Sequence, residues 1–559
     1  MVFKEPLSAT ALGILVHLGI FIRGEWHLRA PAVVIVHAAA LATGSTICAY
    51  NRVMNWWIRA GLCVVCYICG LFTSIIIYRL FFHRIRHFPG PRLAAMSKLW
   101  SVYKCLDYKN HLFLESLHQR YGDFEITIFH PVGWLALDGN DNLNSRSDWY
   151  DLLRPRVSPI FSRNEKDHLE RRKSWNLALS TKGDITRKYI PRIISQIETL
   201  HTIIASAATN ATPILLNDIM LWFAFDSMGE FAFDQSFNML KNGTWHRLVI
   251  QQRSALALLG SLGHTVWAIR IAFVFFSRFW RIRDWINMIS FCDRQIERRL
   301  AIQLTSLAPT PVDVSGYFIK EYEAGKTAEN ERAKWSLLSG NAVSVIIGGR
   351  SSAGSDTTGS TLITLFYFLA LHPSYAEQIH EELSSTENPT DITVLANMPV
   401  LNGFINESMR LIPAALTIGS RLTPSQGLTI DGIYIPGNIK LVAPKYSIYR
   451  RGSVFIEPNT FIPERWYSRP ELVRDKSVFA PFGIGRRTCV GKNLALTQIR
   501  LILARLLPLY TVRFAPGETG KAFERDLRDQ LTAQPGACCV VFEPRLGKEP
   551  VGRDHVPIS

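Results

Sequence analysis

Cysteine is scarce in this sequence, and its distribution does not suit a disulfide framework. The 559 residues contain nine cysteines, an odd number; four of them fall within residues 48–69 of an apolar N-terminal region, and Cys538 and Cys539 are adjacent. Small domains held together by disulfides use paired, spaced cysteines. The folded part of the chain is therefore expected to face a reducing compartment.

Several nucleotide and metal motifs are also missing. The sequence has no GxxxxGK[ST], no GxGxxG after a strand, no HExxH and no Cys/His quartet with zinc spacing. These absences argue against a P-loop enzyme, a dinucleotide-binding domain and a zinc protease. No Lys/Arg-rich block accompanies the net charge of +16, so we expect no nucleic-acid partner. That charge suits an anionic lipid surface or an acidic protein.

Long apolar runs, in contrast, are present near the N-terminus. Residues 7–22, 31–50 and 60–78 are uncharged, and about twenty helical residues cross a bilayer core. Residues 60–78 are the strongest candidate span; residues 7–22 also resemble a signal peptide, but no small-residue cleavage site comes after them. One span and three spans both remain open. We predict a membrane anchor over residues 1–88.

The flank of the third run indicates the orientation of the rest. Four arginines lie after it, at positions 79, 84, 86 and 92, which places that side of the membrane in the cytosol. The "FPGP" stretch then ends the helix. No linker or repeat interrupts the remainder of the chain, so residues 89–559 are predicted to form one large cytosol-facing domain.

The predicted domain is mainly helical with small β-sheets. Apolar periodicity and stop signals predict helices, and β-rich runs around Asp431-Gly432 and Pro436-Gly437 predict a small sheet. The expected helices are 335–372, 376–384, 398–411 and 492–506, and the expected strand regions are 428–444 and 537–542.

The stretch "PFGIGRRTCVGKNLA" (481–495) carries the main chemical signal. Cys489 follows Arg486 and Arg487 and precedes a predicted helix, whose N-terminus favours an anion. Gly485 and Gly491 remove side chains where a flat ligand would approach the backbone. This pattern suits an anionic sulfur bound to iron. The alternative is an inert small residue in a turn.

Three further motifs resolve that choice by resemblance. Residues 482–491 match F-x-x-G-x-R-x-C-x-G, and "AGSDTT" (353–358), "ESMR" and "FIPERW" occur in the expected order. This set resembles the cytochrome P450 family over more than four hundred residues, from "FPGPRLAAMSKLW" to "VRFAPGE". The later part looks most like fungal membrane-bound secondary-metabolism members of the tryprostatin-hydroxylase type.

The resemblance implies roles for the residues of the ligand loop. Cys489 would be the axial thiolate of haem b, which favours O–O cleavage. Arg487 would pair with a haem propionate. Phe482, Gly485 and Gly491 would complete the loop around the cofactor.

The other motifs would support the haem from a distance. Glu407, Arg410 and Arg465 would form a buried ion-pair network with a structural role. Arg172, on the "HLERRKSW" segment, would reach the second propionate side, although a solvated basic face remains an alternative. Arg421 would also contact a propionate.

Oxygen activation would fall to two residues of the long helix. Thr357 would donate a hydrogen bond to dioxygen, and Asp356 would relay protons towards it. Ordinary helix back-bonding is the alternative for the Thr-Thr pair. Arg350, two turns earlier, would point into the pocket or form a salt bridge with a neighbouring helix.

The implied activity is a haem-thiolate monooxygenase acting on a hydrophobic small molecule in fungal secondary metabolism. The chain has no flavin or nicotinamide motif, so electrons would come from an NADPH–cytochrome P450 reductase. An oxygen-independent isomerase or dehydratase, and a non-catalytic haem-binding membrane protein, remain alternatives. Residues 255–276 would be either lid helices dipping into the bilayer or core. Sequons at Asn210 and Asn242 would stay unused in the cytosol.

Overall fold

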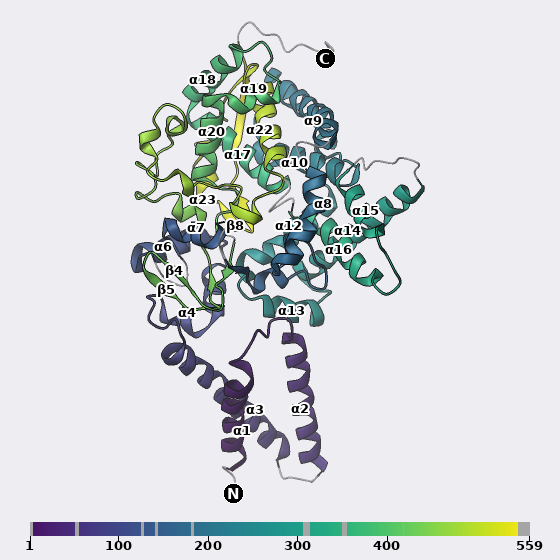
Figure 1. Cartoon of the computed structure of the whole chain (residues 1–559), viewed down its shortest axis with the longest axis vertical. Helices are drawn as coiled ribbons and strands as arrows, with labels where there is room; N and C mark the ends of the chain where they lie inside the picture. Colours follow the sequence, from purple (N-terminus) through teal and green to yellow (C-terminus); the bar gives the residue numbers. More distant parts are fainter. Residues whose placement is uncertain are drawn as a thin grey trace.

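The computed structural model describes residues 4–50, 55–123, 128–139, 143–179, 184–305, 313–348, 355–417 and 419–545 (Figure 1). Positions 349–354 lie outside the described residues, and with them Arg350 and the Ala353-Gly354 part of the "AGSDTT" segment.

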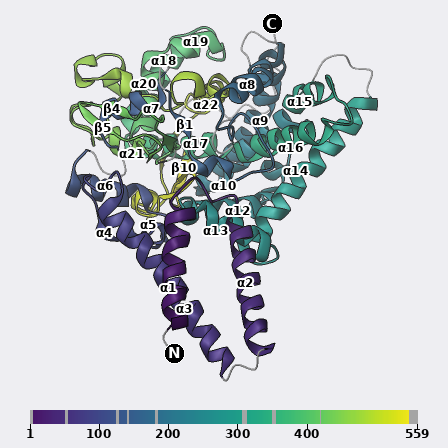
Figure 2. The ribbon, with the colours of Figure 1, turned by 60° about the horizontal axis from the view of Figure 1, so that its bottom comes forward.

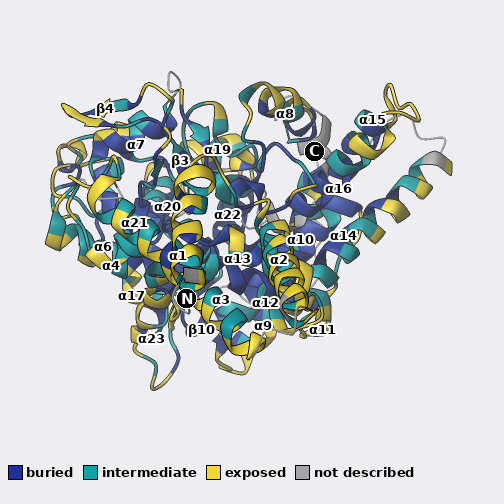
Figure 3. Cartoon of the chain, turned by 90° about the horizontal axis from the view of Figure 1, so that it is seen from below, coloured by how far each residue is buried: buried dark blue, intermediate teal, exposed yellow. Residues whose placement is uncertain are grey.

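Three N-terminal helices project from one end of the catalytic domain (Figures 1 and 2). They are α1 (Lys4–Val16), which continues through a π-helical turn to Phe21, α2 (Ala30–Tyr50) and α3 (Trp56–Ile77), which continues to Phe82. Two of them, α2 and α3, are long and apolar enough to cross a membrane, and only 6% of each apolar window is buried inside the protein. Figure 3 shows the exposed side of α2 from below.

Small residues allow α1 and α3 to pack closely. A Cβ on Gly13 would lie 2.3 Å from the carbonyl oxygen of Tyr67, and a Cβ on Gly70 would lie 2.3 Å from that of Thr10. Close backbone approach through glycine is a typical way for apolar helices to associate in lipid.

Polar side chains also join these helices. His17 Nδ1 lies 2.8 Å from Ser74 Oγ, which links the end of α1 to α3, and His37 Nε2 lies 2.8 Å from the hydroxyl of Tyr67, which links α2 to α3. The three N-terminal helices thus form one assembly.

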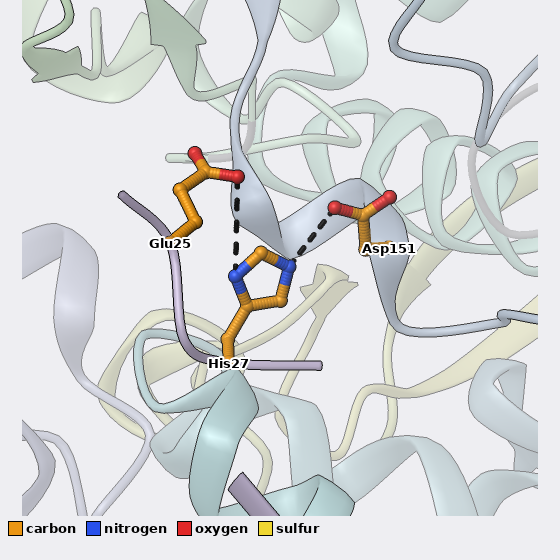
Figure 4. A group of neighbouring side chains, drawn as sticks. All are labelled: Glu25, His27 and Asp151. Atoms are coloured by element: carbon orange, nitrogen blue, oxygen red, sulfur yellow. Dashed lines mark hydrogen bonds and ion pairs between the residues drawn. The ribbon is translucent and has the colours of Figure 1, made fainter. Parts of the chain in front are cut away.

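The connection between α1 and α2 docks onto the catalytic domain (Figure 4). His27 Nε2 lies 2.9 Å from Asp151 Oδ2, and His27 Nδ1 lies 4.0 Å from Glu25 Oε2. Arg163 Nη1 donates to both carboxylates, at 2.6 Å to Glu25 and 2.7 Å to Asp151. Arg163 thus supplies a positive charge between the two acids, and these four residues (Glu25, His27, Asp151 and Arg163) form a docking cluster.

The catalytic domain is built mainly of helices around a central apolar helix. Helix α17 (Ser355–Leu371) is buried nearly all round and contacts α10 (Leu216–Phe233), α20 (Pro399–Leu411) and α22 (Lys492–Leu506). A helix that is apolar on every face belongs in a core. The remaining described helices are α4 (Arg92–Met96), α5 (Lys98–Lys104), α6 (Asn110–Tyr121), α7 (Pro131–Asp138), α8 (Glu165–Leu179), α9 (Asp184–Thr209), α11 (Met239–Asn242), α12 (Arg247–Leu262), α13 (Val266–Phe275), α14 (Trp280–Thr305), α15 (Val314–Glu323), α16 (Glu331–Gly348), α18 (Pro373–Ser384), α19 (Ile392–Asn397), α21 (Lys445–Ile448) and α23 (Lys521–Arg525).

The sheets are small and antiparallel. Their orders are β1-β3-β6, β2-β10-β7, β4-β5 and β8-β9. The strands are β1 (Ser145–Arg146), β2 (Ile214–Leu215), β3 (Arg421–Leu422), β4 (Leu428–Ile430), β5 (Ile433–Ile435), β6 (Lys440–Leu441), β7 (Tyr510–Phe514), β8 (Arg528–Gln530), β9 (Thr532–Gln534) and β10 (Cys539–Pro544). The predicted fold class, mainly α with small β-sheets, is confirmed.

Two expectations about elements need adjustment. The helix predicted over 335–372 is seen as α16 and α17, with positions 349–354 between them outside the description. Residues 255–276 divide between core and surface: α12 buries Leu256 and Leu258, whereas α13 exposes Val274 and Phe275 and contacts α2. Of the two alternatives for residues 255–276, core therefore describes α12, and the exposed apolar end of α13 has the character expected of a lid helix.

Candidate functional site

A large cavity lies beside Cys489, at the start of α22. The space between protein atoms there is about 1240 Å³, including the part that is open to solvent. Residues distant in sequence line it, including Thr357 from α17, Met409 from α20 and Phe482, Gly483 and Gly491 from the loop before α22. Apolar walls and a few convergent polar groups are the features of a cofactor or substrate site.

The Cys489 loop is held by its own backbone. The Cys489 N–H donates to the carbonyl of Phe482 at 2.8 Å, and the Thr488 hydroxyl donates to the carbonyl of Gly485 at 2.7 Å. Gly485 has φ +68°, and a Cβ there would lie 2.4 Å from the carbonyl oxygen of Asp138. Glycine is thus required at 485 by the backbone of α7, not by an approaching ligand as the sequence suggested, whereas Gly491 does line the cavity.

The electrostatics of the sulfur differ from the sequence expectation. Burial raises the pKa of the Cys489 thiol; a backbone N–H of Gly491 and the charges of Arg172, Lys445 and Lys492 oppose that rise only in part. Arg486, expected to help, instead forms an ion pair with Glu165 at 2.6 Å. A bound metal ion would favour the thiolate here far more strongly than these groups do.

The cavity wall also presents buried cationic and N–H donors that lack acceptors. Arg487 Nη2, Arg146 Nε and Trp134 Nε1 are buried without a hydrogen-bond partner, and all three residues line the cavity. Burial and the charge of Arg421 lower the pKa of Arg487 to about 10. Orphaned buried donors are rare and call for a partner. A flat ligand with carboxylates, such as haem b, would supply acceptors here and a metal beside Cys489, so the residues fit that cofactor.

Of the predicted propionate contacts, Arg487 is the one placed with a donor open to the cavity. Arg421 also lines the cavity, but its Nη2 lies 2.5 Å from Asp138 Oδ1, and this carboxylate raises its pKa. Arg172 Nη2 donates to the carbonyl of Thr488 at 2.5 Å and is not part of the cavity wall. Arg421 and Arg172 are therefore positioned to hold the protein around the site.

Sequence reasoning missed three residues of the wall: Arg146, Trp134 and Lys445. Arg146 lies on β1 with its guanidinium 4.3 Å from the ring centroid of Tyr150. Lys445 is buried, donates to the carbonyl of Pro481 at 3.0 Å, and has its pKa lowered to about 8 by burial. None of the three belongs to a spaced motif. Trp134 and Lys445 lie in apolar stretches, whereas Arg146 lies in the polar stretch "NLNSRSD", where nothing marks it as part of a site.

The predicted ion-pair network is brought together by α20 and the "FIPERW" segment. Arg410 donates to both oxygens of Glu407, at 2.9 and 2.8 Å, and Arg465 Nε donates to Glu407 Oε1 at 3.1 Å. Trp466 Nε1 and the Ile462 N–H also donate to Glu407. All three charged side chains are 0% exposed, so each charge depends on its partners.

The two predicted oxygen-activating residues face different ways. Thr357 lines the cavity, whereas Asp356 is buried away from its wall, where its Oδ2 accepts from Gln534 Nε2 at 3.0 Å and from Thr532 Oγ1 at 3.3 Å. The Thr361 hydroxyl donates to the Thr357 carbonyl at 2.7 Å, which is ordinary back-bonding. The β8–β9 hairpin that holds Asp356 had no sequence signal.

Comparison with known proteins gives consistent matches. The sequence model of the family described as Cytochrome P450 matches residues 139–537. Cytochrome P450 monooxygenase FCK2 of Fusarium pseudograminearum is 32% identical over 96% of this chain and 96% of its own length. Tryprostatin B 6-hydroxylase of Aspergillus fumigatus is 31% identical over 93% of both chains, and Cytochrome P450 monooxygenase phqL of Penicillium fellutanum is 30% identical over 94% of this chain and 92% of its own.

Proposed function

The chain belongs to the cytochrome P450 family, and from this membership we propose its residue roles, substrate class, electron donor and membrane arrangement. It is a haem-thiolate monooxygenase. When bound, haem b supplies the activation of O2, one atom of which enters the substrate while the other becomes water.

Cys489 is proposed as the residue whose sulfur would be the axial ligand of the haem iron. The other proposed residue roles depend on this one. Its position at the cavity wall, in a loop fixed by the Phe482 carbonyl, supports this role. Arg487, Arg146 and Trp134 would donate to the haem carboxylates, because their buried N–H groups otherwise lack acceptors. Phe482 and Gly491 would lie against the cofactor. The ion pairs of Glu407 with Arg410 and Arg465 would hold α20 and the "FIPERW" segment together.

Thr357 is proposed to hold a proton at its hydroxyl at the cavity wall. Asp356 would receive protons from the β8–β9 side and pass them along α17. The positions of the two residues support this route. Thr357 lines the cavity, and Asp356 accepts a hydrogen bond from Gln534 at 3.0 Å on the other side.

The proposed substrate is a hydrophobic natural product that is hydroxylated. Trp149, Ile160, Met409, Ala414 and Ala415 form the apolar side of the cavity. A relative named Tryprostatin B 6-hydroxylase supports hydroxylation in fungal secondary metabolism. An isomerase or dehydratase would use no reductant, so NADPH consumption separates it from the proposed reaction, and a non-catalytic protein would show neither product nor consumption.

The proposed electron donor is an NADPH–cytochrome P450 reductase. The described chain carries exposed basic groups near the ligand loop, such as Lys492, which suit an acidic docking surface. Arg486 adds less to such a surface, because it forms an ion pair with Glu165 at 2.6 Å.

We further propose that residues 1–88 anchor the catalytic domain, residues 89–559, in the endoplasmic reticulum membrane with three spans. Exposed apolar residues on α2 and α3 support spanning. The docking cluster holds the α1–α2 connection against the catalytic domain, so both must lie on one side of the membrane. The exposed Val274, Phe275 and Phe276 at the end of α13 would contact lipid.

The reduced, CO-bound absorption spectrum tests the central assignment. The wild-type protein is expected to show a thiolate-type Soret band, and Cys489→Ser is expected to lose it because the sulfur is gone. Cys539→Ser, on strand β10, serves as the matched control and should keep the band. A Cys489→Ser protein with an unchanged spectrum and full turnover would overturn the assignment.

A second experiment tests the proton route. Thr357→Ala should raise the hydrogen peroxide released per NADPH consumed, towards one peroxide for each NADPH, and should lower the rate of product formation by about 10²-fold or more, because one proton-transfer group is lost. The assays use the metabolite that accumulates in a deletion strain. Thr364→Ala, about two helix turns further along α17, removes a back-bonding hydroxyl from the core and should leave coupling unchanged. Equal coupling in wild type and Thr357→Ala would refute this role.

A further inference from the structure

A second, smaller cavity adjoins the one beside Cys489. The space between its protein atoms is about 510 Å³, including the part that is open to solvent, and Trp149, Tyr150 and Gly419 line both cavities. Asp529, from the β8–β9 hairpin, and Thr417 form part of its own wall. A ligand whose reacting end occupies the large cavity can therefore extend past Trp149 and Tyr150 into the small one.

Asp529 is buried in that wall with neutral partners. Its residue is 4% exposed, and its carboxylate accepts a hydrogen bond from the Thr417 hydroxyl, which itself accepts one from Asn110 Nδ2 at 2.8 Å. Within the described part of the chain, no Lys, Arg or His nitrogen forms an ion pair with Asp529. A buried carboxylate normally has a cationic partner, because burial disfavours the isolated charge.

The other ionisable groups around the cavity leave that charge uncompensated. Lys440 lies on the wall, but its Nζ is 3.0 Å from Asp148 Oδ1. Burial lowers the pKa of His264 to about 4, so it is neutral, and burial raises the pKa of the nearby Cys105 thiol to about 12. Burial raises the pKa of Asp529 itself to about 6, which leaves it mostly ionised at pH 7.

Of the two aromatic residues between the cavities, Trp149 is the one that suits a further cation, because the guanidinium of Arg146 already lies 4.3 Å from the ring centroid of Tyr150. The Trp149 and Tyr150 rings meet edge to face, with centroids 4.9 Å apart. Ring faces attract ammonium groups, and more strongly where water is excluded.

We propose that the cavity of Asp529, Thr417, Trp149 and Tyr150 is a subsite for a positively charged nitrogen of the substrate. The substrate class is then a hydrophobic molecule with a basic amine at one end, whose other end is oxidised in the large cavity, which Thr357 lines. This inference rests on the proposed function, because it takes the large cavity as the place of the reaction.

A pair of probes that differ only in charge tests the subsite. (3-Phenylpropyl)trimethylammonium carries a quaternary nitrogen, which cannot ligate iron, and (4,4-dimethylpentyl)benzene has carbon in its place. Binding of each to the full-length holoprotein is followed by tryptophan fluorescence and by the Soret shift. Asp529→Asn removes the charge and keeps an acceptor for Thr417, and Asp526→Asn removes a solvent-accessible charge that pairs with Arg525 at 2.7 Å.

The expected result is selective. Asp529→Asn should weaken ammonium binding by at least about tenfold and leave binding of the neutral probe within about twofold, while Asp526→Asn changes neither. Detergent partitioning cancels because each probe is compared between variants. If Asp529→Asn weakened the binding of both probes equally, Asp529 would act only by holding the hairpin. If it weakened the binding of neither, Asp529 would not contact the ligand. Either result would overturn the proposal.

A measurement on the wild-type protein tests the subsite even if Asp529→Asn does not fold. Between pH 7.5 and 5.0 the ammonium probe should lose affinity as Asp529 takes up a proton, whereas the neutral probe should not; unchanged ammonium binding would refute the subsite. The reduced CO spectrum is recorded on the same samples. Absence of the thiolate band in the wild type would count against the proposed function, and its presence with no charge discrimination would count against the subsite alone.

Discussion

At the scale of single residues, Asp529 shows how a buried charge lowers stability where no partner offsets it. Its folded-state pKa of about 6 lies above the usual value of an aspartate. A raised carboxyl pKa contributes stability that is present below the unfolded-state pKa and is lost as pH rises through the folded-state pKa. Asp529 therefore destabilises the protein at neutral pH relative to about pH 4.

The substitution Asp529→Asn should accordingly stabilise the holoprotein at pH 7.5. The full pKa difference corresponds to about 3 kcal/mol of unfolding free energy, from which one unpaired amide N–H would subtract about 1–2 kcal/mol. Thermal unfolding at pH 7.5 and 4.5 measures the effect: the variant's advantage should shrink at the lower pH. An advantage that is equal at both pH values would contradict this origin.

The sequence could predict the role of a single residue where that role depends on neighbours in the sequence, and not where it depends on a distant partner. Cys489 and Arg487 share one short loop, so the spacing of the sequence placed them together. Arg421 carries the same charge as Arg146, yet a residue 283 positions away, Asp138, neutralises it. No local pattern distinguishes a paired arginine from one with an open donor, and the sequence therefore chose Arg421 and missed Arg146.

At the scale of elements, α20 contributes most of the support behind the site. Glu407 on this helix receives hydrogen bonds from Arg410 and Arg465, both 0% exposed. Glu407→Gln would leave two buried guanidinium groups without their counter-charge. We expect a loss of about 3–5 kcal/mol in unfolding free energy.

Thermal unfolding and the yield of haem-loaded protein measure this loss. Glu381→Gln, on the exposed side of α18, removes a carboxylate that the fold does not require, so it is the matched control. A Glu407→Gln protein as stable as the control would show that the network is dispensable.

Elements with strong periodicity were predictable, and elements fixed by distant partners were not. The expected helix 398–411 is α20, and the β-rich run around Asp431-Gly432 is the β4–β5 hairpin. The β8–β9 hairpin is only three residues per strand, and its residues bind Asp356 and Thr417 far away in the sequence. The β4 and β5 strands are equally short, but Asp431-Gly432 marks their turn, whereas Leu531 between β8 and β9 is not a turn-forming residue, so tertiary contacts decide the place of that hairpin.

At the scale of the whole molecule, the three proposed spans would put the N-terminus across the membrane from the catalytic domain. A glycosylation acceptor fused before residue 1 should be modified in microsomes, because α1 would carry it to the lumen. The exposed Asn210 and Asn242 should stay unmodified in the cytosol. Endoglycosidase sensitivity on gels measures both.

The double variant Asn210→Gln/Asn242→Gln is the control and should migrate like the parent chain. A tag that stays unmodified would indicate two spans, formed by α2 and α3. Glycans at Asn210 or Asn242 would place the catalytic domain in the lumen.

The contact of His27 and Glu25 with Asp151 and Arg163 bears on how the enzyme can be cut for crystallisation. Asp151 directly follows Tyr150, a residue that both cavities share. A version begun near position 89, chosen to remove the apolar helices, would lack two of the four members of this cluster and expose a carboxylate that is now 4% accessible. Its substrate chamber would then have a loosened wall, so ligand affinities measured on such a fragment would describe the fragment rather than the full-length enzyme.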